Sequence, residues 1–516
     1  MLHLIVCVSL AIAQQGPDGR FDQLFEAIAG KPLPGVAVGV VRDGRVTAIR
    51  VAGAADGASG TPITPSTIFR MGSVTKSFTA LAILQLHEQG RLSLADPLSK
   101  FVPDYPHASR ITVEQLLAHT AGVPDFLPME EVFKRPLDFD PGTRINYSNS
   151  GYLLLGRVVE RASGLPWEAY LKRHVFDPAG MTRTGFDAEP VLPGRATGYQ
   201  LSGNGTYTPV SAGDARGAQA AGGLYSTIED MTKWELALAS GKLVHPETLA
   251  RASEPGLLAG GRRTAYGLGF MTGTYRGVRE SGHGGDITGY NSYVARYPDE
   301  RFTVIVLSNV GLRPAGPVPD AGKLARAVAE IGLAGRLKAA DAPLRVAVPA
   351  AVLDTYVGVY RLDAPEIVIR NMGGRDIRIE RDGDRLTGEL GSTRMPLDAH
   401  SPTEFQAPGS PAVLTFIPGA DAGARCQELV VTLMGLREYR AGRVTGPGGQ
   451  GTGPARVDIA PVPQETLDRD REEVFVRAPT PPARRAWPHA VRHTPALPAD
   501  DQKRLVDQGV ELRWPG

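Results

Sequence analysis

Runs of strand-forming residues predict two hairpins that lie far apart in the sequence. Residues 35–41 and 45–52 flank Asp43-Gly44, a dipeptide that favours a tight hairpin turn. Two later runs, within residues 266–309, flank a turn of Pro, Asp, Glu and Arg in the same way. We expect the early hairpin to join the later strands in one antiparallel sheet.

Helical spacing of apolar residues predicts helices between these hairpins. Phe78, Leu81 and Leu84 recur at this spacing within residues 73–90. Further helices are expected at residues 20–28, 112–120 and 152–162 (ended by Gly164), and from a capping box at Ser226-Thr227-Ile228-Glu229 through Leu238. We assign residues 73–90 and 112–120 to a helical subdomain beside the sheet.

From about residue 344 the pattern changes to short alternating runs with glycine-containing turns. Residues 356–360 and 367–370 are two of the expected strands, and Gly373-Gly374 is one of the turns. This pattern favours a small all-β barrel or sandwich over residues 344–442. Residues 443–516 are rich in Pro, Gly and Arg, a composition that buries little apolar surface, so we expect a poorly ordered tail.

The N-terminal residues 1–13 have the pattern of a short signal peptide. Residues 4–13 are apolar and end in Ala11-Ile12-Ala13, a fair cleavage site, although no Lys or Arg precedes them. This run is too short to cross a bilayer as a helix. A periplasmic or secreted protein is therefore expected. Cleavage would also remove Cys7, one of the two cysteines of the chain. Cys426 would be left alone, so no internal disulfide is expected.

The composition sets limits on the class of protein. The 516 residues leave room for two or three domains. The balance of 56 Lys and Arg against 55 Asp and Glu gives no electrostatic basis for binding nucleic acid. No phosphate-binding loop, paired-histidine zinc motif or Gly-x-Ser-x-Gly elbow occurs, so we expect neither metal nor cofactor. The oligomeric state cannot be inferred.

The string Ser73-Val74-Thr75-Lys76 is the only Ser-x-x-Lys sequence in the chain, and it opens an apolar helix. A lysine three residues after a serine lies on the same helical face, so its amine can reach the hydroxyl. Lysine acts as a base only when neutral, and its ordinary pKa is about 10.4. Burial or a nearby positive charge must therefore lower that pKa. The alternative is a helix-capping serine beside a solvated lysine.

Two further strings carry candidate chemistry. Tyr147-Ser148-Asn149 follows a Pro-Gly turn and precedes a helix, so its tyrosine can point into a cleft. A Lys–Tyr pair can share one proton and act as the base, and an asparagine amide can bind a carbonyl or the lysine. Ser281-Gly282-His283-Gly284-Gly285-Asp286 combines glycines, which let a substrate approach a strand closely, with a histidine that can be a cation near neutral pH. Alone, each string is also typical of an ordinary turn.

In this order, the three strings resemble the serine β-lactamase and penicillin-binding-protein-like family. The likeness is to its class C-like branch of β-lactamase-related esterases and D-aminopeptidases, and covers residues 20–335. The connecting stretches 111–122 and 221–227 match as well. The resemblance implies an α+β sandwich with an antiparallel sheet, flanking helices and a helical subdomain. Residues 344–442 resemble the lipocalin-like appendage of such hydrolases, with a structural role or a role in substrate access or association.

The resemblance also implies the roles of the catalytic residues. Ser73 would attack a carbonyl and become acylated, while Lys76 and Tyr147 would move the proton. Backbone amides of Ser73 and Asp286 would form the oxyanion hole, in which each donor contributes about 3 kcal/mol.

The substrate side of the predicted site departs from the antibiotic-hydrolysing pattern. Asn149 would orient the substrate and the base, and His283-Gly284-Gly285 stands where Lys-Thr-Gly is usual. This replacement removes a hydroxyl and makes the positive charge partial at neutral pH. A substrate carboxylate should therefore be held less well than in a β-lactamase.

Together these observations predict a serine hydrolase that acts through an acyl-enzyme on a small-molecule ester, amide or peptide. The first alternative is a β-lactamase or DD-carboxypeptidase. The second is a catalytically weak sensor or scaffold that binds peptidoglycan or a partner.

Overall fold

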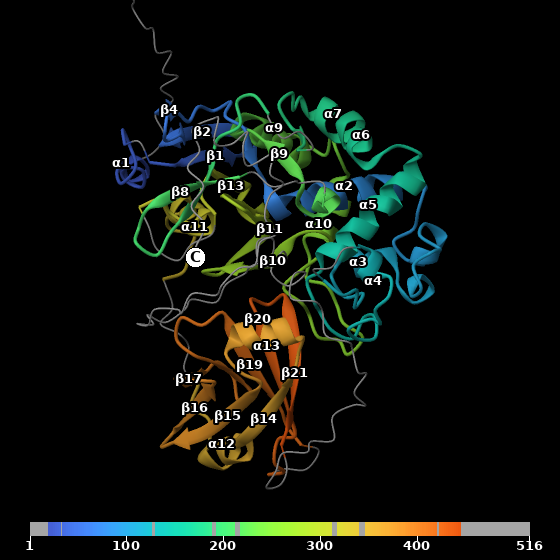
Figure 1. The fold of residues 1–516 in the computed structure, drawn as a ribbon, viewed down its shortest axis with the longest axis vertical. Coiled ribbons are helices and arrows are strands. Elements are labelled where there is room, and N and C mark those ends of the chain that lie inside the picture. Colours follow the sequence, from blue (N-terminus) through green and yellow to red (C-terminus); the bar gives the residue numbers. More distant parts are fainter. Residues whose placement is uncertain are drawn as a thin grey trace, which may run out of the picture. The chain divides into compact units, whose positions relative to one another are not determined.

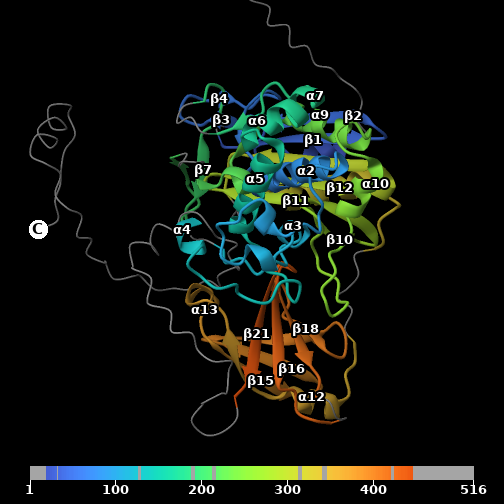
Figure 2. The same ribbon diagram turned by 90° about the vertical axis from the view of Figure 1, so that its right-hand side faces the viewer.

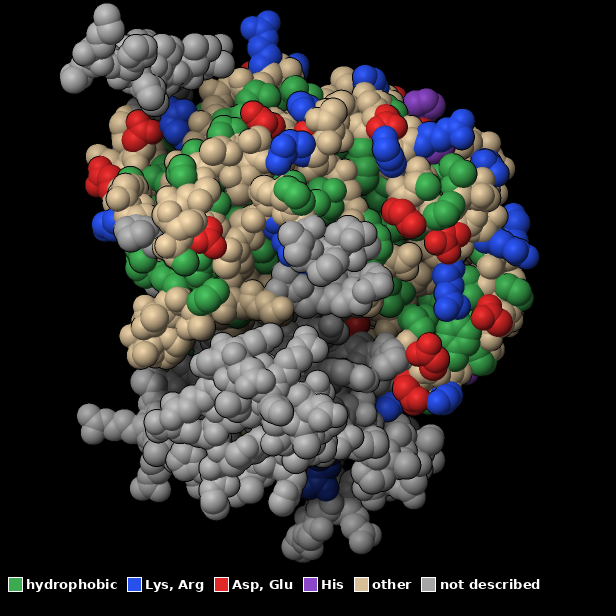
Figure 3. Space-filling view, turned by 45° about the horizontal axis from the view of Figure 1, so that its top comes forward, with side chains coloured by type: hydrophobic (Ala, Val, Ile, Leu, Met, Phe, Trp, Pro, Cys, Tyr) green, Lys and Arg blue, Asp and Glu red, His purple; other side chains and the backbone are tan. Residues whose placement is uncertain are grey.

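The structure, a computed structural model, describes these residues of the chain: 19–31, 33–125, 129–187, 192–211, 217–311, 317–339, 346–419 and 423–444. The predicted signal peptide and nearly all of the predicted tail lie outside the described residues. Within these ranges the structure contains no helix with the length and apolar character that crossing a bilayer requires. On the face shown in Figure 3, basic and acidic side chains are interspersed without a large patch of one sign.

Six antiparallel strands form the central sheet, in the order β10-β11-β12-β13-β1-β2 (Figure 1). Their bounds are β1 Val36–Arg42, β2 Arg45–Ala52, β10 Met271–Tyr275, β11 Val278–Ile287, β12 Tyr290–Tyr297 and β13 Phe302–Ser308. The early hairpin pairs with the late strands, so that Val36 lies opposite Ser308. Asp43 and Gly44 both have positive φ, as the predicted hairpin turn requires. The predicted antiparallel sheet is confirmed.

Helices cover both faces of this sheet. Val304 and Val306 of β13 face the core that contains α11 (Ala321–Gly332). Ile305 and Leu307 face the larger core that contains α9 (Ile228–Ala239). This alternation follows from the two-residue period of a strand. It explains why β13 is buried along its whole length, and it places α9 and α11 on opposite sides of the sheet (Figure 1).

The larger core is built around α2 (Thr75–Glu88), which runs directly on from the 3₁₀ turn η1 (Gly72–Val74). Every residue of α2 from Thr75 to Leu86 is buried, and Phe78 stacks on Trp234 of α9 with ring centroids 4.6 Å apart. Helices of the same layer surround α2 (Figure 2). They are α3 Val113–Leu117, α4 Met129–Val132, α5 Asn149–Ser163, α6 Trp167–Leu171, η4 Lys172–Phe176, α7 Asp177–Ala179, α8 Gln219–Gly222 and α10 Pro246–Ala252.

Short strands complete this part of the molecule. They are β3 Ala54–Asp56 and β4 Thr61–Pro62, then β5 Phe69–Arg70, β6 Gly185–Phe186 and β9 Leu224–Ser226 in one three-stranded sheet, and β7 Gly198–Leu201 with β8 Tyr207–Val210. The pairing of β5 with β9 fixes the chain just before η1.

Several predicted helices differ in extent from the observed ones. The first helix, α1, covers only Gly19–Gln23, and the helix expected at 112–120 covers only α3. The cap of α9 is Thr227 rather than Ser226, because the Thr227 side chain accepts the hydrogen bond from the amide of Asp230. The helix expected at 152–162 begins earlier, at Asn149, and ends at Gly164 as predicted.

The C-terminal part is a closed barrel of eight antiparallel strands (Figure 1). The strands are β14 Gly358–Asp363, β15 Asp376–Asp382, β16 Arg385–Leu390, β17 Thr393–Ala399, β18 Glu404–Gln406, β19 Ala412–Ile417, β20 Glu428–Leu433 and β21 Arg437–Arg443, with α12 Ala350–Tyr356 before them. Buried aromatic side chains fill the interior, where Tyr356 stacks on Phe416. Cys426 is buried in the same core as a free thiol.

One predicted strand of the barrel was wrong. Residues 367–370 belong to a helix, α13 (Glu366–Met372), which lies between β14 and β15. Pro365 is its N-terminal cap, and Gly373 ends it in the left-handed conformation at φ 87°. Proline before and glycine after a segment are helix boundary signals. The run of β-branched residues at 367–369 outweighed these signals in the sequence-based prediction.

Candidate active site

Ser73 and Lys76 lie together at the junction of η1 and α2. The ammonium nitrogen of Lys76 donates hydrogen bonds to Ser73 Oγ at 3.1 Å, to Asn149 Oδ1 at 2.6 Å and to the carbonyl of Ala221 at 2.7 Å. The side chain of Lys76 has no exposed surface. This lysine is therefore not the solvated face residue of the alternative interpretation.

Burial changes the protonation of this lysine. It lowers the pKa of Lys76 to about 7, because a buried ammonium loses its hydration. The negative charge of Asp125 raises this pKa and the positive charge of Arg437 lowers it. A large fraction of Lys76 is thus neutral at physiological pH, as a base beside a serine hydroxyl must be.

Tyr147 lies on the other side of the same lysine. The nitrogen of Lys76 is 4.7 Å from the centre of the Tyr147 ring. Burial raises the pKa of the Tyr147 hydroxyl far above its ordinary value, and the Ser73 side chain lowers this pKa to a smaller extent. For this coupled pair, burial favours neutral Lys76 together with protonated Tyr147, so the lysine rather than the tyrosine is the candidate base.

Asn149 is the first residue of α5, and its position depends on how that helix begins. The side chain of Ser148 caps the helix by accepting a hydrogen bond from the amide of Gly151 at 3.0 Å. The amide of Asn149 donates to Asp125 Oδ1 at 2.7 Å. These contacts hold the Asn149 carboxamide against Lys76.

Strand β11 lies against η1 at van der Waals distance, and glycines make this approach possible. A Cβ atom on Gly285 would lie 2.0 Å from the carbonyl oxygen of Met71, and one on Gly72 would lie 2.9 Å from the amide nitrogen of Asp286. The hydroxyl of Ser292 donates to the same Met71 carbonyl at 2.7 Å. This packing brings the backbone of Asp286 next to that of Ser73, where the two amides of the predicted oxyanion hole would have to meet.

His283 differs from its prediction in charge. Its side chain is buried, with Nε2 2.8 Å from the hydroxyl of Tyr266 and Nδ1 2.5 Å from the carbonyl oxygen of Gly284. Burial, with a smaller contribution from the charge of Lys76, lowers the pKa of His283 to about 3. The imidazole is therefore neutral at pH 7 rather than a partial cation.

His119 is a buried residue that packs against the site. Its ring centroid is 4.3 Å from that of Tyr147, 4.6 Å from that of Tyr266 and 5.0 Å from that of Tyr152. Its Nδ1 accepts a hydrogen bond from the amide of Ser148 at 3.1 Å. Among the described residues its Nε2 has no hydrogen-bond partner. Burial, with a smaller contribution from Lys76, lowers the pKa of His119 well below its ordinary value.

Two charged residues near Lys76 were missed by the sequence analysis. Asp125 accepts the amide hydrogen of Asn149, and its other oxygen accepts from an Nη atom of Arg437 at 2.7 Å. Arg437 belongs to β21 of the barrel, 312 residues later in the sequence. Neither residue stands in a motif, so no local signal could have identified them.

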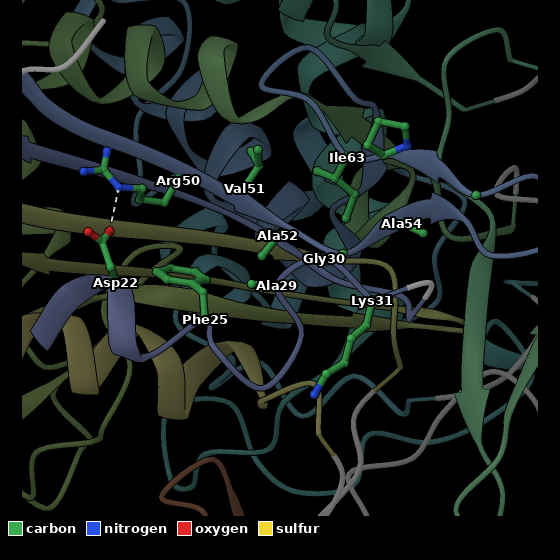
Figure 4. A pocket seen from close by; sticks show the side chains of 13 residues that line it. Asp22, Phe25, Ala29, Gly30, Lys31, Arg50, Val51, Ala52, Ala54 and Ile63 are labelled. Carbon is green, nitrogen blue, oxygen red and sulfur yellow. Dashed lines mark hydrogen bonds and ion pairs between the residues drawn. The ribbon is translucent and has the colours of Figure 1, made fainter. Parts of the chain in front are cut away.

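A pocket of about 620 Å³ lies elsewhere, between the N-terminal segment and β2 (Figure 4). Phe25, Arg50 and Lys31 are among its lining residues, and the guanidinium of Arg50 pairs with Asp22 at its edge. Its lining contains no serine, cysteine or histidine, so it offers none of the side chains of the predicted acyl-transfer site. The described ranges also contain no group of three or more His, Cys, Asp or Glu residues that could hold a metal ion.

Comparisons with known proteins match this architecture. A family model described as Beta-lactamase matches residues 21–330, more than half of the chain. A penicillin-binding protein of Bacillus subtilis (strain 168) is 26% identical over 445 residues, covering 79% of this chain and 96% of that protein. The D-aminopeptidase of Gluconobacter oxydans (strain 621H) is 28% identical over 319 residues, covering 57% of this chain and 59% of that protein. The solved structure of SurE has a TM-score of 0.59 at 27% identity and covers 82% of this chain and 98% of that one.

Proposed function

Because the chain belongs to the beta-lactamase family, we propose that it hydrolyses an ester or a small amide through an acyl-enzyme on Ser73. The observation that carries this proposal is the 3.1 Å hydrogen bond between Ser73 Oγ and a buried Lys76 whose pKa is about 7. A serine hydroxyl becomes a useful nucleophile when a neutral base of this kind accepts its proton.

The residues around Ser73 suggest each step of the reaction. Neutral Lys76 accepts the proton as Ser73 Oγ bonds to the substrate carbonyl carbon, and the carbonyl oxygen becomes an oxyanion between the amides of Ser73 and Asp286. The intermediate collapses when the bond to the leaving group breaks, and that group takes a proton from Tyr147 or Lys76. Water then attacks the carbonyl carbon of the acyl-serine and gives a proton to the same pair of residues. The bond between that carbon and Ser73 Oγ breaks, Oγ takes the proton back from the pair, and the acid is released.

The state of His283 supports an ester or amide without a free carboxylate as the substrate. Its neutral imidazole offers no cation for such a group, and Gly284 supplies no hydroxyl. The relative that is a D-aminopeptidase supports a small amide or a peptide with an N-terminal D-residue. The relative that is a penicillin-binding protein supports the second candidate, a β-lactamase or DD-carboxypeptidase.

Labelling with a fluorophosphonate probe tests the nucleophile. We expect the wild-type protein to be labelled and the Ser73→Ala variant to be unlabelled. Ser77→Ala is the matched control, because Ser77 lies on the same helix but donates its hydrogen bond to the carbonyl of Gly269 rather than contacting Lys76. Folded wild-type protein that takes no label would favour the peptidoglycan-binding sensor or scaffold instead.

A substrate panel separates the remaining candidates. We expect p-nitrophenyl esters or D-amino-acid amides to be turned over much faster than nitrocefin. Nitrocefin turnover comparable to ester turnover would instead support a β-lactamase. Acylation in a single turnover without recovery of free enzyme would support a binder built from the same residues.

We also propose export of the chain to the periplasm or the medium. The support is the apolar run at residues 4–13, which ends in a small-residue cleavage sequence. The intact mass of the protein purified from its source cells tests this: an N-terminus at Gln14 is expected, and a retained Met1 in the cytosolic fraction would contradict it.

A further inference from the structure

We propose that the loop between β20 and β21 of the barrel is part of the active site, and that Arg437 is a positioning residue that acts on Lys76 and Asn149 through Asp125. This inference rests on the proposed role of Ser73 and Lys76. It gives a residue of the C-terminal barrel a role in the active site. The roles predicted for that barrel were structural support, substrate access or association.

Backbone hydrogen bonds join this part of the barrel to the segment that carries Tyr147. The amide of Tyr147 donates to the carbonyl of Leu436 at 2.9 Å, and the amide of Glu438 donates to the carbonyl of Ile145 at 3.2 Å. Asn146 and Arg437 thereby lie opposite each other as an antiparallel bridge. The barrel therefore extends the backbone of the catalytic loop as an added strand would.

Charged side chains continue the contact toward Lys76. Arg437 pairs with Asp125 at 2.7 Å, with side-chain exposures of only 15% and 3%. Asp125 accepts the amide hydrogen of Asn149, and Asn149 accepts a hydrogen bond from Lys76. The guanidinium carbon of Arg437 is also 6.0 Å from the centre of the Tyr147 ring. One chain of contacts thus leads from the barrel to the base.

The charges around Lys76 explain why this ion pair matters. The titratable and charged groups that face Lys76 are Asp125, Arg437, His119, His283, Tyr147 and Tyr152. Both histidines have lowered pKa values and both tyrosines have raised ones, so all four are neutral at pH 7. Asp125 raises the pKa of Lys76 and so favours its charged form. Arg437 offsets this effect, so that Lys76 can be neutral at physiological pH.

A second contact supplies a control for the docking of the barrel itself. Arg262 pairs with Glu438 of β21 through two hydrogen bonds, and one of them measures 2.7 Å. Gly435 lies against Ala265, where an added Cβ atom would be 2.8 Å from the alanine side chain. Arg262 is not among the charges that affect the pKa of Lys76. Its removal disturbs the same interface without changing the charge near the base.

The test measures the rate of fluorophosphonate labelling of the full-length protein against pH. In Arg437→Met the acid limb of the profile should move up by about one pH unit, because a single uncompensated charge near a buried group has this effect. Labelling near pH 6 should fall up to about tenfold as a result. In Asp125→Asn the acid limb should move to lower pH. In Arg437→Lys, which keeps the positive charge, the limb should stay close to its wild-type position.

The matched variant Arg262→Met should leave the limb in place even if it lowers Tm. An equal shift in Arg262→Met and Arg437→Met would overturn the proposal, because docking of the barrel alone would then explain the effect. An unshifted limb in Arg437→Met would overturn it as well. Both outcomes can be distinguished from a failure of the proposed function. If the proposed function is wrong, even the wild-type protein takes no label at Ser73.

Discussion

At the scale of single residues, the site depends on what each neighbour does to the charge of Lys76 and the position of Ser73. Burial gives Lys76 a pKa of about 7, so acylation should increase with pH as the ammonium loses its proton. The two glycines of the site are equally important for its geometry. Because Gly72 and Gly285 have no side chain, η1 and β11 can lie against each other. Small changes at either kind of position should have large effects on activity.

Gly285→Ala tests the close approach of β11 and η1. The new methyl group would meet the carbonyl oxygen of Met71 at 2.0 Å and Ser292 Oγ at 2.4 Å, so the strand must move away from η1. We expect the rate of Ser73 acylation to fall at least about 100-fold, the effect of losing one oxyanion donor.

The control is Gly273→Ala on the neighbouring strand β10, where an added Cβ atom meets nothing within 4 Å. This variant should keep wild-type activity. Full activity in folded Gly285→Ala would show that the amide of Asp286 has no role in the reaction.

The sequence predicted residues that stand in motifs and missed those that do not. Ser73, Lys76, Tyr147 and Asn149 come from two short strings, and the structure places the other three around Lys76. The neutral state of His283 could not be read from its glycine neighbours, because burial depends on the packing of distant elements. Asp125 and Arg437 were missed for the same reason, since their pairing is fixed only by the fold.

At the scale of elements, the N-terminus of α5 is the support that holds Asn149 in place. Its cap, Ser148, also donates its amide hydrogen to His119, so one residue connects the helix start to the aromatic side chains around Tyr147. The stability of this helix end and the geometry of the site should therefore change together.

Ser148→Ala tests this connection against a cap of another helix. Loss of a cap lowers the free energy of unfolding by about 1 kcal/mol, and we expect this in both Ser148→Ala and Thr227→Ala. Only Ser148→Ala should also slow acylation, because the Thr227 side chain accepts a hydrogen bond from Asp230 of α9 and not from a residue in contact with Lys76. Denaturant unfolding and labelling rates measure the two effects. Equal loss of activity in both variants would mean that global stability, rather than helix position, limits the reaction.

Sequence patterns predicted long elements better than short ones. The hairpin of β1 and β2 followed from turn residues and apolar runs, which report on local backbone geometry. The sequence placed it in one sheet with the later strands, but its pairing with β13 is fixed only by the fold. The short helix α13 did not, because a few β-branched residues favour a strand until their flanking Pro365 and Gly373 are considered. The closed arrangement of the barrel depends on pairing between β14 and β21, which are far apart in sequence.

At the scale of the whole molecule, the charges that we propose to control the reaction are buried. The formal net charge is +1, and acidic and basic side chains are mixed on the face shown in Figure 3. The ion pair near Lys76 is shielded from solvent, with side-chain exposures of 15% and 3%. Dissolved salt should therefore have little access to the groups that set the pKa of the base.

We expect the acid limb of the labelling profile to stay in place between low salt and about 0.5 M salt, because mobile ions screen buried pairs much less than exposed ones. The rate with a neutral ester should also change little. A limb that moves with salt would show that the charges acting on Lys76 are exposed to solvent during the reaction.

The bridge between Asn146 and Arg437 also bears on the order in which the chain is made. A ribosome that has completed the six-stranded sheet has already made Ser73, Lys76, Tyr147 and His283, but β21 is the last strand of the described structure. With the proposed role of Arg437, the base of a nascent chain would be more protonated until the barrel has been translated. Closure of the barrel would then act as a maturation step that raises the reactivity of Ser73 by up to about tenfold.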